Sequence, residues 1–241
     1  VASDTQITCD FDLTGAATGT WDVVVTNPDT QEGDLAFGFR VNLGWGSLAA
    51  WGYNYYHECD VLAGNDFIAV SGGGWHSLAL RSNGSIAGWG YNGWLQCNVP
   101  AGTDFVAVSA GGNHSLALRS DGSIAGWGYN EYGQATPPAG NDYVAVAAGS
   151  FHGLAIRRDG SLAAWGDNGD GQCNVPAGNN YIAIAAGAFH SLALRADGSV
   201  AAWGSNGSGQ CDVPAGSFTA IAAGDWHSLA VKADGSLAAW G

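Results

Sequence analysis

The heptapeptide Gly84-Ser85-Ile86-Ala87-Gly88-Trp89-Gly90 occurs in almost the same form six times in a chain of 241 residues. Aligned on its Gly-Ser pair, the chain divides into five successive units, four of 38 residues and the last of 37, followed by the start of a sixth copy. The copies begin at Gly46, Gly84, Gly122, Gly160, Gly198 and Gly235. A fixed period of this length is typical of architectures in which neighbouring repeats bury a common core.

Each unit carries three clear strand signals and one weak one. In the second unit the clear signals lie at Ser85–Trp89, Phe105–Ser109 and His114–Arg119, and the weak one lies at Cys97–Val99 before a proline. The second and third of these runs are rich in apolar residues of the kinds that favour strands. The Asp121-Gly122 pair joins two apolar runs, which predicts a two-residue type I′ hairpin. The repeat shows no helical periodicity.

Both faces of the first strand are apolar, with Ile86 and Gly88 on one side and Ala87 and Trp89 on the other. A two-layer sandwich would leave one face polar. A propeller blade is instead covered on both faces by its neighbours. The sequence therefore predicts an all-β fold, a β-propeller of five 38-residue repeats over residues 44–241.

The segment Val70–Leu80, with the sequence VSGGGWHSLAL, resembles the signature of the regulator-of-chromosome-condensation repeat family. Equivalent segments start at Val108, Val146, Ile184 and Ile221. The short repeats, with GQCNVPAG at 171–178, are similar to the secreted β-lactamase-inhibitor type of this propeller. That resemblance implies binding of a protein through the loops of one face, although a fold by itself does not fix a function.

Residues 1–43 lie outside the repeat, and strands are expected at Thr5–Leu13, Trp21–Thr26 and Leu35–Val41. The segment Gly19–Asp29 resembles the second half of an immunoglobulin-like domain of the transcription-factor/plexin type. The chain also starts without methionine, so we expect it to be a portion of a longer protein.

The ends of the repeat array predict how a ring would close. The Trp-Gly strand occurs six times, but the strand pair that precedes it occurs five times. The strands at Trp21–Thr26 and Leu35–Val41 have the pattern to supply the missing pair, which predicts six blades with the N-terminal segment completing one. The alternative is a half-domain beside an open ring, which would close by self-association with a second chain.

Composition narrows the possible partners. Seven Lys and Arg stand against 21 Asp and Glu, giving a formal charge of −14. A chain this acidic repels phosphate backbones, so nucleic acid is excluded as a partner. No apolar run approaches the roughly 18 residues of a membrane span, so membrane insertion is not expected.

The histidines and cysteines recur at fixed repeat positions, which favours structural roles. Equivalent positions in neighbouring blades are too far apart to share a metal ion or to form a disulfide. We therefore expect buried, hydrogen-bonded histidines at His76, His114, His152, His190 and His227. We expect unpaired thiols at Cys59, Cys97, Cys173 and Cys211, and no metal or cofactor.

Catalysis is not expected. His76 and Ser77 are neighbours on a strand and point to opposite faces, so these two cannot pair as base and nucleophile. Asp167–Gly171 is similar to the start of a calcium loop but lacks the downstream glutamate, which favours a plain turn. No unit interrupts the repeat with its own pair of carboxylates.

Two loops vary among the units, one before the histidine and one after Trp-Gly. Both should emerge at one end of the propeller, opposite the Asp-Gly hairpins, and they are rich in the aromatic residues that dominate binding sites. The predicted binding residues are Tyr55, Tyr56, Trp75, Trp94, Tyr132, Phe151, Asp167, Asp170, Phe189 and Trp226. The alternative is that the aromatic residues before the histidine pack between blades.

These features favour an extracellular or cell-surface recognition propeller that binds an extracellular protein. A carbohydrate-binding lectin is the first alternative, because exposed tryptophans also stack on sugar rings. A passive repeat module of a larger adhesin or filament is the second.

Deletion of residues 1–43 tests the predicted closure. If these residues complete a blade, the shortened protein should lose apolar burial and melt at a lower temperature than the full chain. Differential scanning calorimetry of the two chains measures this. An unchanged melting temperature would contradict the six-bladed arrangement.

Overall fold

The computed structural model describes residues 47–241, and the predictions for residues 1–43, including the immunoglobulin-like resemblance, lie outside this range. The described residues form five antiparallel sheets of three strands each. The first sheet is β1 (Phe67–Gly72), β2 (His76–Arg81) and β3 (Ile86–Gly90), and the second is β4 (Phe105–Ala110), β5 (His114–Arg119) and β6 (Ile124–Gly128). The others are β7 (Tyr143–Ala148), β8 (His152–Arg157), β9 (Leu162–Gly166), β10 (Tyr181–Ala186), β11 (His190–Arg195), β12 (Val200–Gly204), β13 (Phe218–Ala223), β14 (Ser228–Lys232) and β15 (Leu237–Trp240).

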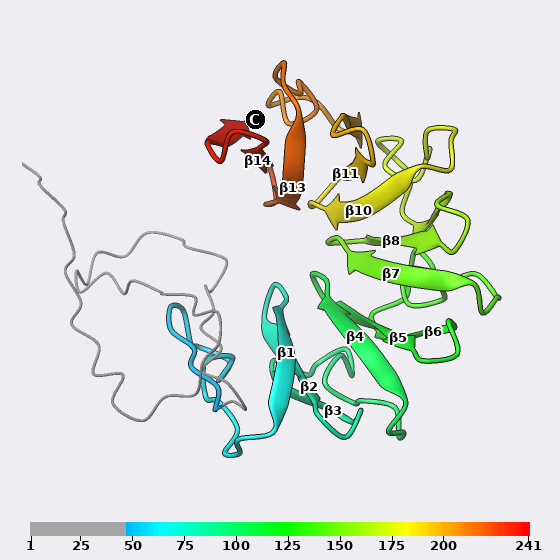
Figure 1. Ribbon diagram of the computed structural model, residues 1–241. Coiled ribbons are helices and arrows are strands. Elements are labelled where there is room, and N and C mark those ends of the chain that lie inside the picture. The colour runs from blue at the N-terminus through cyan, green and yellow to red at the C-terminus, as the bar shows by residue number, and fades with distance from the viewer. Residues whose placement is uncertain (1–46) are drawn as a thin grey trace, which may run out of the picture.

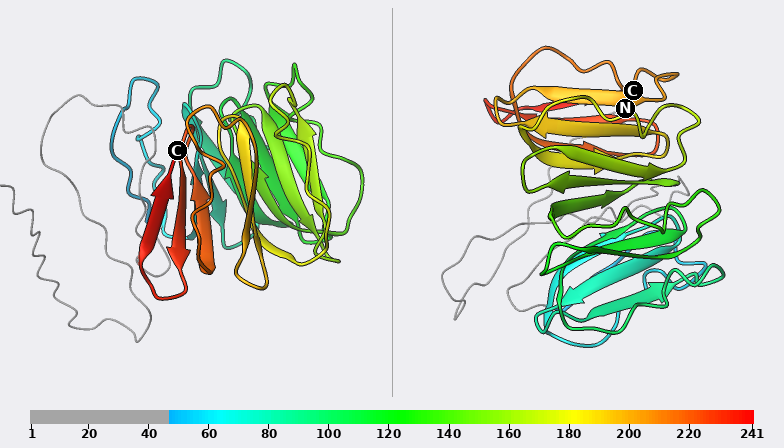
Figure 2. Two further views of the ribbon diagram at one scale, coloured as in Figure 1. Left: turned by 90° about the horizontal axis from the view of Figure 1, so that it is seen from above. Right: turned by 90° about the vertical axis from the view of Figure 1, so that its right-hand side faces the viewer.

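The five sheets follow one another around an arc, from the cyan first sheet to the orange and red last one (Figure 1). The two further views show each sheet facing the next (Figure 2). The predicted all-β fold with five repeats is confirmed.

The predicted fourth strand at Cys97–Val99 is wrong, because its backbone bonds locally instead of joining a ladder. Cys97 N donates to Asn92 Oδ1, Asn98 N to Leu95 O, and Val99 N to Cys97 O, so the three amide hydrogens form turns. Pro100 then lacks an amide hydrogen. Each blade therefore has three strands and a tightly folded loop.

The hairpin between the second and third strand of each sheet also differs from the predicted two-residue type I′ turn. Gly84 N donates to Arg81 O, and Arg81 N donates to Ser85 O. Three residues, 82–84, therefore form the loop between the bonded pair. Only the glycine has a positive φ, +80°, whereas a type I′ turn requires positive φ at both central residues. The Asp-Gly signal thus marks a hairpin with a glycine bulge.

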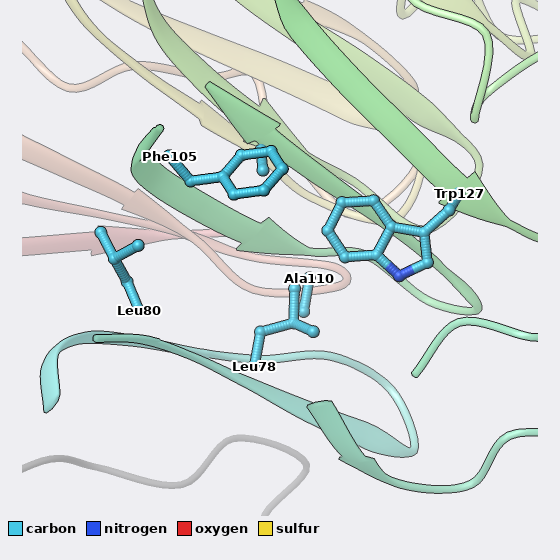
Figure 3. Close-up of a cluster of buried hydrophobic side chains, with 6 residues drawn as sticks. Leu78, Leu80, Phe105, Ala110 and Trp127 are labelled. Carbon is cyan, nitrogen blue, oxygen red and sulfur yellow. The ribbon is translucent and has the colours of Figure 1, made fainter. Parts of the chain in front are cut away.

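The core lies between successive sheets. Leu78 and Leu80 of β2 face Phe105 and Ala110 of β4, with the Trp127 indole of β6 beside them (Figure 3). Alanine and glycine residues on both faces of the sheets let the sheets approach closely. The same cluster recurs at the following junctions.

A buried hydrogen-bonded clamp joins the sheets at three of the four junctions within residues 47–241. Ser115 Oγ and Trp127 Nε1 both donate to Gln96 O, at 2.9 and 2.7 Å. Because the serine has given its hydrogen to this carbonyl, it accepts from His76 Nε2 of the previous sheet at 2.9 Å. His76 Nε2 therefore carries a hydrogen, and burial, which lowers the pKa of His76 to about 4, keeps the ring neutral at pH 7. The same His–Ser bond joins His152 to Ser191 and His190 to Ser228.

The third sheet departs from this pattern because Gly153 replaces the serine. His114 Nε2 then has no hydrogen-bond partner among the described residues. The Trp165 ring occupies the space instead, since a Cβ on Gly153 would lie 2.4 Å from Trp165 Cζ2. Packing thus replaces one hydrogen bond of the clamp.

Of the five histidines expected to be buried and hydrogen-bonded, His76, His152 and His190 are both. His114 is buried without a bond to its ring, and His227 is exposed. No further sheet within residues 47–241 packs on the outer face of β13–β15. For the same reason Leu229 is 41% exposed, whereas its counterpart Leu78 is fully buried.

The four buried histidines should make the protein less stable in mild acid. Burial lowers the pKa of His76, His152 and His190 to about 4 and that of His114 to about 3, against 6.5 in the unfolded chain. Below pH 6.5 the unfolded chain therefore binds more protons than the native one, so the free energy of unfolding falls as the pH drops. Each histidine contributes up to about 1.4 kcal/mol per pH unit. Urea unfolding from pH 7 to about pH 4 measures the slope.

His76→Gln is the matched variant, because an amide nitrogen can still donate to Ser115 without titrating. Its stability should fall less steeply with acid than that of the natural chain. A free energy of unfolding that stays constant through this pH range in the natural chain would show that the histidines are not held neutral.

Candidate functional site

The two variable loops of each unit meet at one end of the sheets, as predicted. Tyr91 N, at the start of the loop after Trp-Gly, donates to Trp75 O of the loop before the histidine at 2.8 Å. The same bond joins Asp167 N to Phe151 O. The hairpins lie at the other end, where Gly84 O accepts from the first strand of the next sheet. We call the loop end, residues 53–60, 73–75, 91–98, 111–113, 129–136, 149–151, 167–174, 187–189, 205–212 and 224–226, the aromatic face.

The predicted aromatic residues form two groups of touching rings. Tyr55, Tyr56 and Trp75 form the first group together with Tyr53 and Tyr91, with ring centroids 4.9 to 6.3 Å apart. The second group is a line of rings across four units, in the order Trp94, Tyr129, Tyr132, Phe151, Phe189 and Trp226. Aromatic residues from separate repeats therefore share one surface.

The residues before the histidines, for which recognition and packing between blades are the two interpretations, differ in exposure. Trp75 is 42% exposed and Trp226 is 52% exposed, which is far more than a packing residue requires. Phe151 and Phe189 are half-buried and lie in line between Tyr132 and Trp226. The two phenylalanines thus support the surface while the tryptophans and tyrosines form it.

An asparagine and a glutamine, replaced by a glutamate in the first unit, bond the backbone of each loop after Trp-Gly, and the sequence interpretation overlooked both. Asn92 Oδ1 accepts from Cys97 N, while Asn92 Nδ2 donates to Asn98. Gln96 is fully buried, and its Oε1 accepts from Trp94 N. Both residue types recur at these positions, with Glu58 in place of the glutamine in the first unit. That recurrence inside an otherwise variable loop was the available signal.

The two predicted aspartates have different surroundings. Asp167 Oδ2 accepts from Gln172 Nε2 at 2.8 Å, and its Oδ1 accepts from Gly169 N at 3.2 Å, so this carboxylate organises its own loop. Asp170 is exposed, and only its backbone N, which donates to Gln172 Oε1, is tied into the loop. Asp170 is therefore the better placed of the two to contact another molecule.

Two residues of the aromatic face hold a left-handed backbone that favours glycine. His57 has φ +66° and Leu95 has φ +65°, whereas the equivalent residues of the later units are Gly133, Gly171 and Gly209. A side chain in this conformation costs roughly 1–2 kcal/mol. Leu95 is also 59% exposed, so its side chain gains little from packing. Strain of this kind is characteristic of functional sites.

The repeat cysteines are unpaired, as predicted. Each thiol donates to a carbonyl six residues earlier, as from Cys97 Sγ to Tyr91 O at 3.3 Å and from Cys173 Sγ to Asp167 O at 3.1 Å. Burial raises the pKa of both thiols to about 11, so they are poor nucleophiles at neutral pH. They serve to close the loops.

The serine and histidine of the clamp come from neighbouring sheets, a pairing that the sequence did not indicate. The distance resembles that of a nucleophile and its base, but Ser115 is fully buried and donates its hydrogen to Gln96 O. Within residues 47–241, no three His, Cys, Asp or Glu side chains are grouped to hold a metal ion. The described part of the chain also contains no helix with the length and apolar character needed to cross a bilayer.

A sequence model of the regulator of chromosome condensation (RCC1) repeat matches residues 67–93, 105–134, 143–172, 181–210 and 218–241. These segments make up more than half of the chain, and the chain belongs to the RCC1 repeat family. No curated protein sequence matches it. The finer likeness to the β-lactamase-inhibitor type stays a prediction.

Several solved structures share the fold. The ectodomain of the receptor kinase CR4 from Physcomitrella patens has a TM-score of 0.70 at 24% identity, covering 80% of this chain and 57% of that one. Prp20p from Saccharomyces cerevisiae has a TM-score of 0.62 at 23% identity, covering 69% and 56%. The ectodomain of ACR4 from Arabidopsis thaliana has a TM-score of 0.65 at 23% identity, covering 80% and 73%. The chain thus spans less than two thirds of the first two, and these identities show the fold alone.

Leu95→Gly tests the strained position. Glycine adopts the left-handed conformation without a steric penalty, so the substitution should raise the free energy of unfolding by about 1 kcal/mol. Gly133→Ala is the reverse control, because a Cβ there meets nothing within 4 Å and its cost is conformational alone. Denaturant unfolding compares the two variants with the natural chain. A loss of stability in Leu95→Gly would show that this side chain stabilises the fold.

Proposed function

We propose that this chain is a non-catalytic recognition propeller of the cell exterior or cell surface, which binds a protein partner through the aromatic face. The observation that carries the proposal is the pair of ring groups formed by separate repeats on one end of the fold. Exposed apolar surface of this kind is costly for a soluble protein and marks interaction sites.

The rigidity of the loops supports this proposal. Polar side chains bond the backbone of the loops that carry the exposed aromatic residues, as Asn92 does at Cys97 N and Gln96 at Trp94 N. Binding residues held in place before association lose little conformational entropy on binding. The strained backbone of Leu95, beside Trp94, adds an exposed apolar side chain to the same loop.

The relatives support a protein partner and a place outside the cell. Two of the similar structures are ectodomains of plant receptor kinases, and Prp20p is described with its binding to Gsp1p and histones. Catalysis is not part of the proposal, because each buried serine of a Ser–His pair donates its hydrogen to a backbone carbonyl and cannot reach a substrate. Binding through this face requires no cofactor.

The test compares proteins captured from native extracellular fluid by the immobilised natural chain and by Trp75→Ala and Trp226→Ala. Loss of an aromatic anchor should weaken capture by about 2 kcal/mol, or roughly thirtyfold. Ser123→Ala, beside a hairpin at the opposite end, is the matched control and should capture as the natural chain does. Quantitative mass spectrometry of the retained proteins gives the measurement.

Equal capture by all three variants, with unchanged melting temperatures, would mean that the partner does not bind the aromatic face. A glycan array, probed with the same variants, distinguishes the lectin alternative. Glycan binding that depends on Trp75 and Trp226, without protein capture, would replace the protein partner by a carbohydrate.

A further inference from the structure

The two ends of the described fold differ in charge. All Lys and Arg residues between 47 and 241 lie at the hairpin end, where they finish the second strand of a sheet or follow it directly: Arg81, Arg119, Arg157, Arg158, Arg195 and Lys232. The aromatic face carries no Lys or Arg in the described chain. Its acidic residues are Glu58, Asp60, Glu131, Asp167, Asp170, Asp212 and Asp225.

The hairpin end shows how this fold accommodates a guanidinium group. The Arg81 guanidinium lies 4.3 Å from the centre of the Phe67 ring, and its Nη1 donates to Asp66 Oδ1 at 2.6 Å. The same combination of ring, carboxylate and arginine recurs at Arg119 and Arg157. Each cation there is held by π-face attraction and by a charged hydrogen bond together.

The aromatic face has exposed rings and carboxylates, and the described chain places no Lys or Arg among them. Asp225 adjoins the exposed Trp226 in the chain, and Glu131 lies between Tyr129 and Tyr132, accepting a hydrogen bond from the Tyr129 hydroxyl. Asp170 is exposed in the neighbouring unit. Burial raises the pKa of the Asp225 carboxyl, the direction expected for an acid that is partly desolvated.

We propose that the aromatic face binds an arginine- and lysine-rich segment of its protein partner, whose cationic side chains stack on the exposed rings and pair with Asp225 and Asp170. This rests on the proposed function and names the chemistry of the partner. The complementarity of charge selects such a segment, because an acidic or phosphorylated one would meet only carboxylates on this face. Arginine suits the site best, since its planar group stacks on aromatic rings.

The test uses a short fluorescent peptide of alternating Arg and Gly, with an otherwise identical citrulline peptide that keeps the shape and lacks the charge. Binding to the full chain is measured by fluorescence anisotropy. The variant pair Asp170→Asn with Asp225→Asn should bind the arginine peptide roughly three- to thirtyfold more weakly than the natural chain, and so should Trp226→Ala. The citrulline peptide should bind none of them measurably.

The matched control is the pair Asp121→Asn with Asp159→Asn at the hairpin end, which changes the net charge by the same amount. Asparagine keeps these turns, because Asn83 makes the same bond to Ser85 N in the first unit. This pair should bind the arginine peptide as the natural chain does. Equal weakening by both pairs, or no binding of the peptide to the natural chain, would overturn the proposal. Should Asp225→Asn fail to fold, Asp170→Asn alone is compared with Asp121→Asn.

The outcome can be told apart from that of the proposed function. If Trp226→Ala loses the captured proteins while the arginine peptide neither binds nor competes with them, the aromatic face binds a protein that is not basic. In that case the inference about charge fails and the proposed function stands.

Discussion

Each sheet formed by residues 47–241 has only three short strands, so its stability depends on the junction with the next sheet. The junction is closely packed, and Ala110 N donates across it to Ser71 Oγ of the previous sheet at 2.9 Å. Its most deeply buried polar feature is the clamp of His, Ser, Trp and a glutamine carbonyl. Its polar atoms cannot reach water, so they are costly unless they bond one another. The clamp thereby fixes the orientation and register of one sheet against the next. The third sheet shows that the tryptophan ring can fill the place of the serine without changing the fold.

The same junction also fixes the position of the variable loops on the aromatic face. The glutamine whose carbonyl receives the clamp also holds the backbone of the variable loop, as Gln96 does with Trp94 N. Core and loop are therefore linked through single residues, and neighbouring loops are as regularly spaced as the sheets. Exposed residues such as Trp94 and Tyr132 can vary among the units because the scaffold beneath them does not depend on their side chains.

The charges reinforce this division between the two ends. At the hairpin end, arginines are neutralised within the fold by carboxylates and stacked on rings, as Arg119 is on Phe105 beside Asp104. At the aromatic end the rings and carboxylates lack cations of their own in the described chain. The hairpin end thus has carboxylate partners within the chain for Arg81, Arg119 and Arg157. The carboxylates of the aromatic face have no Lys or Arg of the described chain beside them, so the cations of a partner can pair with them.

The repeat made most of the fold predictable from sequence, because the period and the apolar character of both strand faces permit few arrangements. The sequence determined the all-β class, the five repeats, the unpaired cysteines and the grouping of both variable loops at one end. Local bonding explains what it predicted wrongly. Asn92 Oδ1, Leu95 O and Cys97 O accept from the backbone amides of Cys97, Asn98 and Val99 in turn. The hairpins adopt a glycine bulge, since only their glycine has positive φ. Only the tertiary structure paired histidine with the serine of the next sheet, exposed His227 at the outer face of the last sheet, and arranged the rings into lines. The His–Ser contacts join residues 38 or 39 positions apart, and the ring contacts also join separate units. These distances depend on the angle between sheets and not on the order of residues along the chain.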